Sequence, residues 1–313
     1  MDVLSDAIAA VRVGRPSSNR LRVSGSWSSR FAEYDGAGFH VVLAGGCWLL
    51  PDGGPAVTLG PGDAVLLPRG TGHVLADSPV DARTAAAAVP FERWRDDHLG
   101  RPDRPEPPAG APGTAELLCG KYRLDHSRAH PLLTELPDVV HLPGRAGGHP
   151  ELRAAIDLLG REVGEPGAGS GVVVPGLLDV LLVYLVRAWT RDNASAPGAG
   201  WPAALNDPVV TAALRALHED PARPWTNERL AAEVGVARAT LARRFTALVG
   251  RPPMAYLTWW RMTRAATLLR GTRAPLESIA AQVGYGSPYA LSHAFSRELG
   301  VTPGRYRTAA TAR

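Results

Sequence analysis

Apolar residues near the end of the chain recur at helical spacing in two separate stretches. The first stretch has Leu241, Phe245 and Leu248 at positions i, i+4 and i+7, and the second has Leu291, Phe295 and Leu299 at i, i+4 and i+8. Such spacing places one apolar stripe along each helix. A short alanine-rich helical segment ending in glycine precedes both stripes, and glycine allows the left-handed backbone of a tight turn. We therefore predict two helix-turn-helix units.

The two units form an internal repeat. Val234-Gly235 in the first unit returns as Val283-Gly284 in the second, and the correspondence continues to Tyr256 and Tyr306. A single repeat favours two related units over a solenoid, which needs three or more. Residues 254–270 between the units predict a helix about 25 Å long. A connector of that length suits two recognition helices in successive major-groove segments, which lie about 34 Å apart.

The first part of the chain has short apolar runs separated by glycine and proline. The runs that we expect to form strands are Phe39–Leu43, Cys47–Leu50, Ala56–Leu59, Ala64–Leu67 and His73–Ala76. Many short strands with frequent turn signals predict a sandwich or barrel. Residues 1–13 predict an amphipathic helix that leans on this domain, and the Pro/Gly-rich residues 96–114 predict a mobile loop.

Two further helices are expected at 151–163 and 175–191. The second is apolar around most of its circumference, so it needs a partner: either its own β domain or a second copy of the chain in a homodimer. The small residues of 193–201 predict a flexible linker. We therefore predict a two-domain α+β protein, with a β-rich domain carrying helices at 1–192, a linker at 193–204 and an all-α domain at 205–313.

Charge differs between the two domains. Residues 205–313 contain 15 arginines against 7 acidic residues, whereas residues 1–204 contain 19 basic against 23 acidic residues, in keeping with the net charge of +4. A basic domain with two helix-turn-helix units fits double-stranded DNA. Arginine can read guanine, small apolar groups can contact a thymine methyl, and hydroxyls can reach bases or phosphates. The side chains opposite the apolar stripes are the ones that we expect at the DNA. They are Ala239, Ala242, Arg243 and Thr246 in the first unit, with Arg238 in the opening turn and Arg244 on the flank, and Tyr289, Ser292, His293 and Ser296 in the second unit, with Ser287 at the helix start.

Other functional classes find no support in the residues. The N-terminus is acidic and lacks the apolar core of a secretory signal. The most apolar run, 172–189, is interrupted by Pro175, Gly176 and Asp179 and is too short for a membrane span. No glycine-rich phosphate loop and no Ser/His/Asp or Cys/His catalytic set is visible. We therefore expect a cytoplasmic protein that is neither an enzyme nor bound to a membrane.

The last hundred residues resemble the DNA-binding domain of AraC-type transcriptional regulators, most specifically in the ending FSRELGVTPGRYR. In that family the second helix of each unit enters the major groove. By position, the resemblance implies that Ala239, Thr240, Ala242 and Arg243 face DNA from the first helix, and that Pro288, Tyr289, Ser292 and His293 do so from the second. Because the family often has larger polar side chains at positions 239 and 242, base reading by the first helix would rest largely on Arg243. The expected partners are promoter DNA, RNA polymerase and a second copy of the chain.

The first 190 residues resemble the cupin-like sensor domains that are fused to AraC-type tails. Gly62 to His73 fits the second cupin motif, G-x5-P-x-G-x2-H. Phe39 to Trp48 (F-H-x-V-L-x-G-x-C-W) and Cys119 to Asp125 (C-G-x-[YF]-x-x-D) are similar to one subgroup of these domains. The first cupin motif is degraded, because the His-x-His and glutamate set of metal-dependent cupin enzymes is missing. The resemblance implies a β-barrel that senses a small-molecule effector or another signal.

Four residues of this domain are candidates for the sensor: His40, Cys47, His73 and Cys119. Two imidazoles and two thiolates suit a tetrahedral site for zinc or another transition metal. The two cysteines alone suit a redox or electrophile sensor. Equally, buried cysteine often acts as a small apolar residue, and an old cupin histidine can be a hydrogen-bonded core residue.

Three functions remain open at this point. The first is a sequence-specific transcriptional regulator whose cupin-like domain senses a small molecule, metal or redox signal and controls promoter binding or activation. The second is a metal-dependent cupin enzyme with an appended DNA-binding tail, although the three histidines that it needs are missing. The third is an architectural protein that binds DNA without sequence preference. The repeat, the charge division and the linker favour the first.

Overall fold

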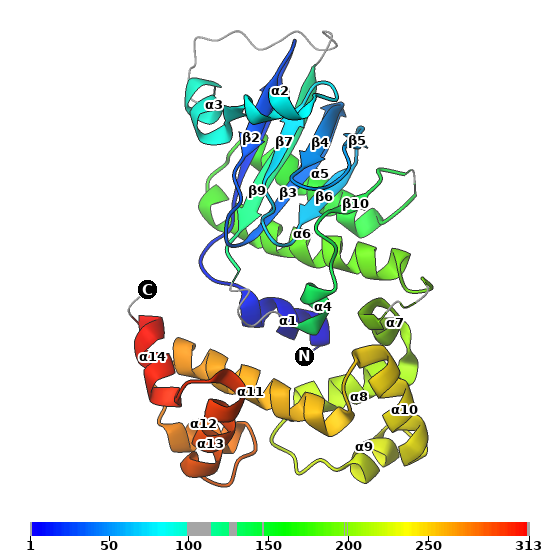
Figure 1. The fold of residues 1–313 in the computed structure, drawn as a ribbon, viewed down its shortest axis with the longest axis vertical. Coiled ribbons are helices and arrows are strands. Elements are labelled where there is room, and N and C mark those ends of the chain that lie inside the picture. The colour runs from blue at the N-terminus through cyan, green and yellow to red at the C-terminus, as the bar shows by residue number, and fades with distance from the viewer. Residues whose placement is uncertain are drawn as a thin grey trace. The chain divides into compact units, whose positions relative to one another are not determined.

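The computed structural model describes residues 2–98, 114–124, 130–145, 147–196, 198 and 200–311. They fold as two compact units, which we call the β unit (Arg12–Ser127 and Leu136–Trp189) and the helical unit (Met1–Val11, Arg128–Glu135 and Thr190–Arg313). Figure 1 shows the elements of both units. The predicted α+β architecture, sheet-rich at the N-terminal side and helical at the C-terminal side, is confirmed. Most of the predicted mobile loop, residues 99–113, lies outside the described residues.

Two five-stranded sheets form the β unit. Their strand orders are β1-β9-β3-β6-β10 and β5-β4-β7-β2-β8, and the β2–β8 pair is parallel while the other pairs are antiparallel. The strands are β1 (Ser17–Val23), β2 (Ser28–Phe31), β3 (Ala37–Gly45), β4 (Cys47–Pro51), β5 (Val57–Leu59), β6 (Ala64–Leu67), β7 (His73–Ala76), β8 (Val89–Pro90), β9 (Ala115–Tyr122) and β10 (Val140–Leu142). All five runs expected to be strands are present, with end shifts of up to two residues.

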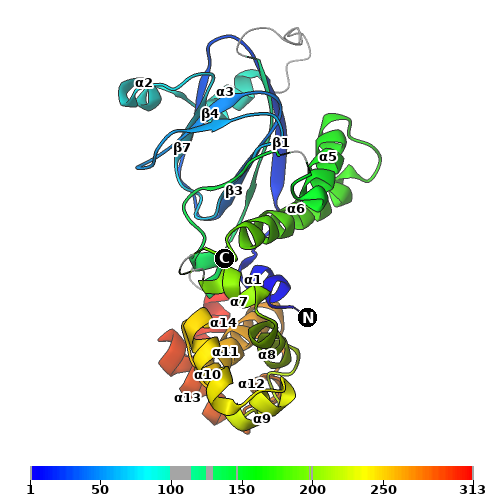
Figure 2. The ribbon, with the colours of Figure 1, turned by 90° about the vertical axis from the view of Figure 1, so that its right-hand side faces the viewer.

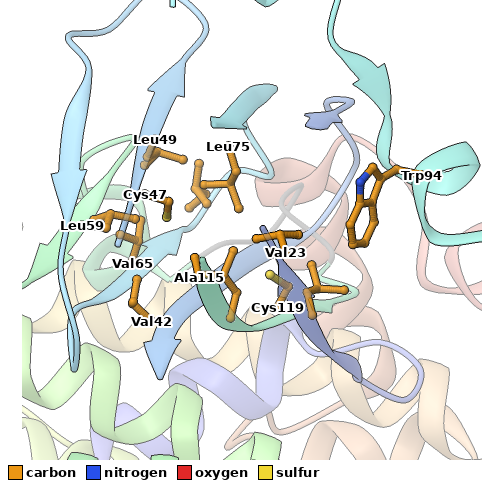
Figure 3. Packing of buried hydrophobic residues seen from close by; sticks show 13 residues of the cluster. Val23, Val42, Cys47, Leu49, Leu59, Val65, Leu75, Trp94, Ala115 and Cys119 are labelled. Carbon is orange, nitrogen blue, oxygen red and sulfur yellow. The ribbon is translucent and has the colours of Figure 1, made fainter. Parts of the chain in front are cut away.

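Alternate residues of the strands fill the space between the two sheets. Ala115, Leu117 and Cys119 of β9 pack with Leu49 of β4 and Leu75 of β7 in one apolar cluster. Figure 3 shows this packing and places both cysteines within it. Since successive side chains of a strand point to opposite faces, the intervening residues of β9 lie on the other face of their sheet. The core of the β unit is therefore shared by the two sheets.

The second face of β9 explains the motif that begins at Cys119. Gly120 pairs with Phe39 across β3 and β9. A Cβ atom at Gly120 would lie 2.4 Å from the Phe39 ring and 2.6 Å from the Ser17 carbonyl oxygen, so only glycine fits. Tyr122, next on the same face, packs on Phe39 with ring centroids 5.7 Å apart. The C-G-x-Y spacing thus places a thiol inside the core and an aromatic pair outside it.

Four helices accompany the sheets: α2 (Ala82–Ala86), α3 (Phe91–His98), α5 (Pro150–Gly164) and α6 (Ser170–Asp192). Helix α5 packs on β1 (Figure 2). The Tyr122 hydroxyl donates a hydrogen bond of 2.7 Å to the Leu178 carbonyl oxygen of α6, and Asp179 pairs with Arg12. Among the described residues, one helix, α6, is long enough and apolar enough to cross a membrane. A third of its most apolar stretch is buried within the protein. The contacts of Leu178 and Asp179 fix its inner face to the β unit.

The helical unit contains both predicted helix-turn-helix units, α9–α10 and α12–α13. Its helices are α1 (Val3–Val11), α4 (Pro131–Thr134), α7 (Gly200–Asn206), α8 (Pro208–Glu219), α9 (Asn227–Glu233), α10 (Arg238–Val249), α11 (Pro253–Gly271), α12 (Leu276–Gln282), α13 (Pro288–Leu299) and α14 (Pro303–Thr311). Gly235 and Gly284 take the left-handed backbone (φ 70° and 80°) that each turn requires. Helix α11 runs from the first helix-turn-helix unit to the second (Figure 1).

Two sequence expectations need correction. The N-terminal helix was expected to lean on the first domain, but α1 belongs to the helical unit and packs on α8 and α11. The expected linker at 193–204 ends in helix α7, where Trp201 and Ala204 are fully buried. The Trp201 backbone N–H donates to the Glu135 carboxylate at 2.8 Å. Composition could not show these positions to be ordered, because their partners lie far away in the sequence.

A buried chain of hydrogen bonds joins these distant segments of the helical unit. His218 lies 2.8 Å from Asp6 and 2.7 Å from the Tyr256 hydroxyl, which lies 2.9 Å from His130. The Leu132 backbone N–H donates to His130 Nδ1, so His130 Nε2 carries the proton and donates to Tyr256. With both rings neutral, Tyr256 in turn donates to His218 Nε2, and His218 Nδ1–H donates to Asp6. The direction of every bond in the chain is thereby determined.

This chain predicts that acid weakens the protein. Burial lowers the pKa of both His218 and His130, so the unfolded chain binds more protons than the folded one below about pH 6.5. The free energy of unfolding should therefore fall as the pH drops from 7.5 to 5.5, by at most about 1.4 kcal/mol for each of these histidines. Urea unfolding at the two pH values measures the effect.

The matched variant is His218→Gln, whose amide can bond to both Asp6 and Tyr256 but does not titrate. Its loss of stability between pH 7.5 and 5.5 should be smaller than that of the wild type. An identical loss in both proteins would show that His218 does not resist protonation in the folded state.

Candidate functional site

The outward face of α10 presents the residues expected at DNA in the first unit. Leu241, Phe245 and Val249 are buried and hold the helix to the unit. Ala239 and Arg243 are exposed on the other side, whereas Thr240 and Ala242 are half-buried. Within the part of the chain that the structure describes, no ion pair or hydrogen bond is found for the Arg243 side chain. Arg243 is therefore available to a base.

The arginines on either side of this face have protein partners. Arg238 lies 2.6 Å from Glu228, and both side chains are exposed. Such surface pairs contribute about 0–1 kcal/mol, so a phosphate can replace the carboxylate at little cost. Arg244 pairs with Asp207, whose side chain also accepts hydrogen bonds from the first turn of α8. Sequence periodicity placed Arg244 at the flank, and its partner gives it a role within the fold.

The second unit presents a different set of side chains from α13. Tyr289 is 81% exposed, an unusual degree for an aromatic ring, and His293 is exposed one turn further along. Pro288 and Ser292 are half-buried. The Ser287 hydroxyl accepts a hydrogen bond of 3.2 Å from the Ala290 backbone N–H and so caps the helix. The capping bond assigns Ser287 a structural role that its sequence position alone did not show.

The connector α11 has 19 residues, which corresponds to about 28 Å at 1.5 Å per residue. Both recognition helices end in a left-handed glycine, Gly250 and Gly300, and are held by equivalent buried phenylalanines, Phe245 and Phe295. The repeat therefore supplies two similar scaffolds with different exposed side chains: Ala239 and Arg243 on α10, Tyr289 and His293 on α13.

In the β unit, three of the four candidate sensor residues meet between the sheets. His40 Nδ1 lies 3.0 Å from Cys119 Sγ, and His40 Nε2 lies 2.7 Å from His73 Nε2. His73 Nδ1 lies 2.8 Å from the Thr71 carbonyl oxygen, which can only accept. With neutral rings, His73 donates to Thr71, His40 donates to His73, and the Cys119 thiol donates to His40. We call this set the Cys119–His40–His73 chain.

Burial keeps this chain uncharged at neutral pH. It lowers the pKa of His73 to about 4 and that of His40 well below its usual range, and it raises the pKa of Cys119 well above the usual value. Cys47 lies in the same core, and burial raises its pKa to about 12, with a smaller contribution from Asp63. Both thiols are therefore protonated, which makes them poor nucleophiles as they stand.

The residues do not fit a metal ion. The two ring nitrogens of His40 point in different directions, one to Cys119 and the other to His73, so one ion cannot bind all three side chains. Among the described residues, no group of three or more His, Cys, Asp or Glu side chains is arranged to hold a metal ion. The four candidate sensor residues thus form no single tetrahedral site of the kind that zinc prefers.

Aromatic rings connect the Cys119–His40–His73 chain to α3. Phe31 stacks on His73 with ring centroids 4.8 Å apart and makes an edge-to-face contact with His40 at 4.9 Å. Phe91 of α3 also stacks on Phe31 at 4.5 Å, and Trp94 stacks on Phe91 at 6.3 Å. The sequence pattern does not indicate these rings, because their contacts join residues of four elements, β2, β3, β7 and α3.

The chain is similar to known proteins along most of its length. Residues 2–191 match the family described as Cupin, and residues 230–309 match the family described as Helix-turn-helix domain. A protein of Streptomyces lividans named as an AraC-like transcription regulator is 36% identical over 98% of both chains. The HTH-type transcriptional regulator MtrA of Neisseria gonorrhoeae is 28% identical over 98% of both chains. The DNA-binding domain of AdpA in complex with a target DNA is 34% identical over 34% of this chain and 96% of that chain, with a TM-score of 0.32.

These full-length relatives are transcription regulators, so a metal-dependent cupin enzyme is not favoured. The residues matched to the Cupin family contain both sheets, together with α1 and α4 of the helical unit. The residues matched to the Helix-turn-helix domain family contain both helix-turn-helix units except the first residues of α9. The chain therefore belongs to the AraC-like transcription regulators, with a cupin domain followed by a DNA-binding helix-turn-helix domain.

Proposed function

We propose that this regulator reads a specific promoter sequence with the exposed faces of α10 and α13. The observation that carries the proposal is the repeated scaffold, which exposes Arg243 on one helix and Tyr289 and His293 on the other. Arg243 suits the O6 and N7 atoms of guanine, and Ala239 suits a thymine methyl. Tyr289 and His293 offer hydrogen-bonding and apolar atoms to the second major-groove segment of the DNA. Arg238 contacts phosphate once its exchangeable pair with Glu228 opens.

The first test separates base reading from phosphate contact. Arg243→Ala and His293→Ala should each weaken binding to a selected cognate site by roughly 5- to 150-fold, because a base contact is worth about 1–3 kcal/mol. Binding to random DNA should change much less. Fluorescence anisotropy with purified full-length protein, at several salt concentrations, measures both.

Arg161→Ala is the matched control, since it removes an exposed arginine from α5 of the β unit. It should leave both affinities unchanged. Equal losses of Arg243→Ala on cognate and random DNA would make Arg243 a phosphate contact, and a wild type without sequence preference would favour the architectural protein.

We further propose that the β unit senses the signal through the Cys119–His40–His73 chain. His40 and Cys119 stand on β3 and β9 of one sheet, whereas His73 stands on β7 of the other. The His40–His73 hydrogen bond therefore ties the two sheets together in a core that is mostly apolar. A thiol oxidant that modifies Cys119 Sγ removes the proton that Cys119 donates to His40 Nδ1. His40 then loses one partner, which disturbs its hydrogen bond to His73 and changes how the two sheets pack.

Two substitutions of one residue test the sensor. Cys119→Ser keeps a proton donor to His40, whereas Cys119→Ala leaves His40 Nδ1 unpaired in the core and should cost about 1–3 kcal/mol of stability. Both should bind the cognate site without oxidant, and both should lose the oxidant response. Thermal unfolding and anisotropy measure the two effects.

Cys47→Ser is the companion variant, because Cys47 shares the core but not the chain. If both serine variants respond to the oxidant as the wild type does, the cysteines are structural only. The effector then acts elsewhere in the β unit.

We also propose that two copies of the chain associate through the outer face of α6. Val173 and Val180, each 42% exposed, lie on this face with Gly176 between them at helical spacing. The inner face is occupied, since Leu178, Leu181 and Leu185 are fully buried. A membrane span would expose that inner face, whereas a second α6 covers only the outer one. The glycine allows the two helices to approach closely.

Val180→Asp should therefore weaken dimerisation at least about tenfold, because it buries an unpaired charge. Sedimentation velocity over a concentration series measures this. Val13→Asp is the control, since Val13 is 40% exposed and lies outside α6. A wild type that is monomeric at all concentrations, or a Val180→Asp dimer of unchanged affinity, would contradict the proposal.

A further inference from the structure

Three parts of the helical unit meet at one arginine in the middle of α11. Arg261 Nε donates to the Pro221 carbonyl oxygen at 2.7 Å, and Arg261 Nη2 donates to the Arg223 carbonyl oxygen at 3.1 Å. Its guanidinium carbon lies 5.9 Å from the centroid of the Tyr285 ring. Pro221 and Arg223 belong to the loop before α9, and Tyr285 belongs to the turn between α12 and α13. Arg261 therefore contacts the loop that leads into the first helix-turn-helix unit and the turn of the second unit.

The loop that Arg261 holds is itself ordered and continuous with the first unit. The Trp225 indole donates to the Asp220 carbonyl oxygen at 2.8 Å, and the Arg223 N–H donates to the Asp220 side chain at 3.0 Å. Arg229 of α9 reaches back to the Pro224 carbonyl oxygen at 2.8 Å. A displacement of this loop therefore moves α9 and, through the turn that follows, α10.

The turn on the other side leads into the second recognition helix. The Tyr285 N–H donates to the Ala280 carbonyl oxygen at 2.8 Å, and Ser287 caps α13 two residues later. Gly284 lies directly against the loop: a Cβ atom there would be 2.8 Å from Ala222 Cα and 2.9 Å from the Arg261 guanidinium. The second turn, the loop and Arg261 are thus in close contact.

The first turn serves as an internal comparison. Gly235 has the same left-handed backbone as Gly284, but a Cβ atom at Gly235 would meet nothing within 4 Å. Backbone conformation alone explains Gly235, whereas Gly284 is also required by close packing. The contact with the loop is therefore a specific feature of the second turn and not a general property of the motif.

We infer that Arg261 is a positioning residue that fixes the relative placement of α10 and α13, and thereby the spacing between the two DNA segments that the protein accepts. Arginine suits this task because its planar guanidinium holds two carbonyl oxygens at once and stacks on an aromatic ring. Lysine has the charge but lacks this fixed geometry. The inference rests on the proposal that both recognition helices read DNA.

The experiment measures affinity as a function of spacing. The starting DNA is the site that the wild-type protein selects, with its two contacted segments at their natural separation. We compare binding to this site with binding to sites in which the separation is one base pair longer or shorter, for the full-length wild type and Arg261→Gln. The wild type should prefer the selected separation by about tenfold or more. In Arg261→Gln this preference should fall to about twofold, while binding to a single segment stays within about twofold. Arg261→Lys should be intermediate.

The control is Arg264→Gln, which removes a charge from α11 one turn further along and should keep the wild-type spacing preference. Circular dichroism and thermal unfolding identify any variant that does not fold, and Arg261→Lys then provides the measurement. An unchanged preference in a folded Arg261 variant overturns the inference. Equal losses at all separations, with a reduced salt dependence, make Arg261 a phosphate contact instead. A wild type that selects no two-segment site refutes the proposed reading by both helices, which is a different result.

Discussion

The helical unit depends on the hydrogen bonds that the buried Tyr256 hydroxyl makes. This hydroxyl is fully buried and hydrogen-bonded on both sides, to His218 and to His130. Because an unpaired polar group in a core costs about 1–3 kcal/mol, each member of the chain requires the next one. The last acceptor, Asp6, comes from the N-terminal helix, 212 positions before its partner His218. The helical unit is therefore completed by two segments from much earlier in the chain, because Asp6 and His130 lie 212 and 126 positions before their respective partners, His218 and Tyr256.

This requirement explains which parts of the fold were predictable. The apolar stripe of Leu241 and Phe245, and its copy at Leu291 and Phe295, are local patterns, and the helices follow from them. Strands such as Ala64–Leu67 are likewise marked by composition and turn residues. The position of α1 was not predictable, because an amphipathic helix carries no information about which apolar surface it covers. His218 and Asp6 show that surface only once the fold has brought them together.

The same limit applies to the candidate site. Sequence position correctly suggested that Arg243 and His293 are exposed, since helical periodicity determines which side faces away from the core. It also grouped His40, Cys47, His73 and Cys119. The structure joins three of them in a chain that Cys47 does not enter, and the sequence did not give the order of the hydrogen bonds. That order depends on the Thr71 carbonyl oxygen, a backbone acceptor that any residue supplies. The difference between a metal site and a neutral hydrogen-bonded chain lies in the direction of two ring nitrogens.

The two helix-turn-helix copies show how local and long-range constraints act on one motif. The local constraints are equal in both, which is why a glycine stands at 235 and 284 and a phenylalanine at 245 and 295. The long-range constraints differ, because one turn is open around its glycine and the other packs against Ala222 and Arg261. A repeat detected in the sequence therefore establishes that two recognition helices exist. How far apart they stand is determined by residues outside the repeat, in the loop at 220–225 and on α11.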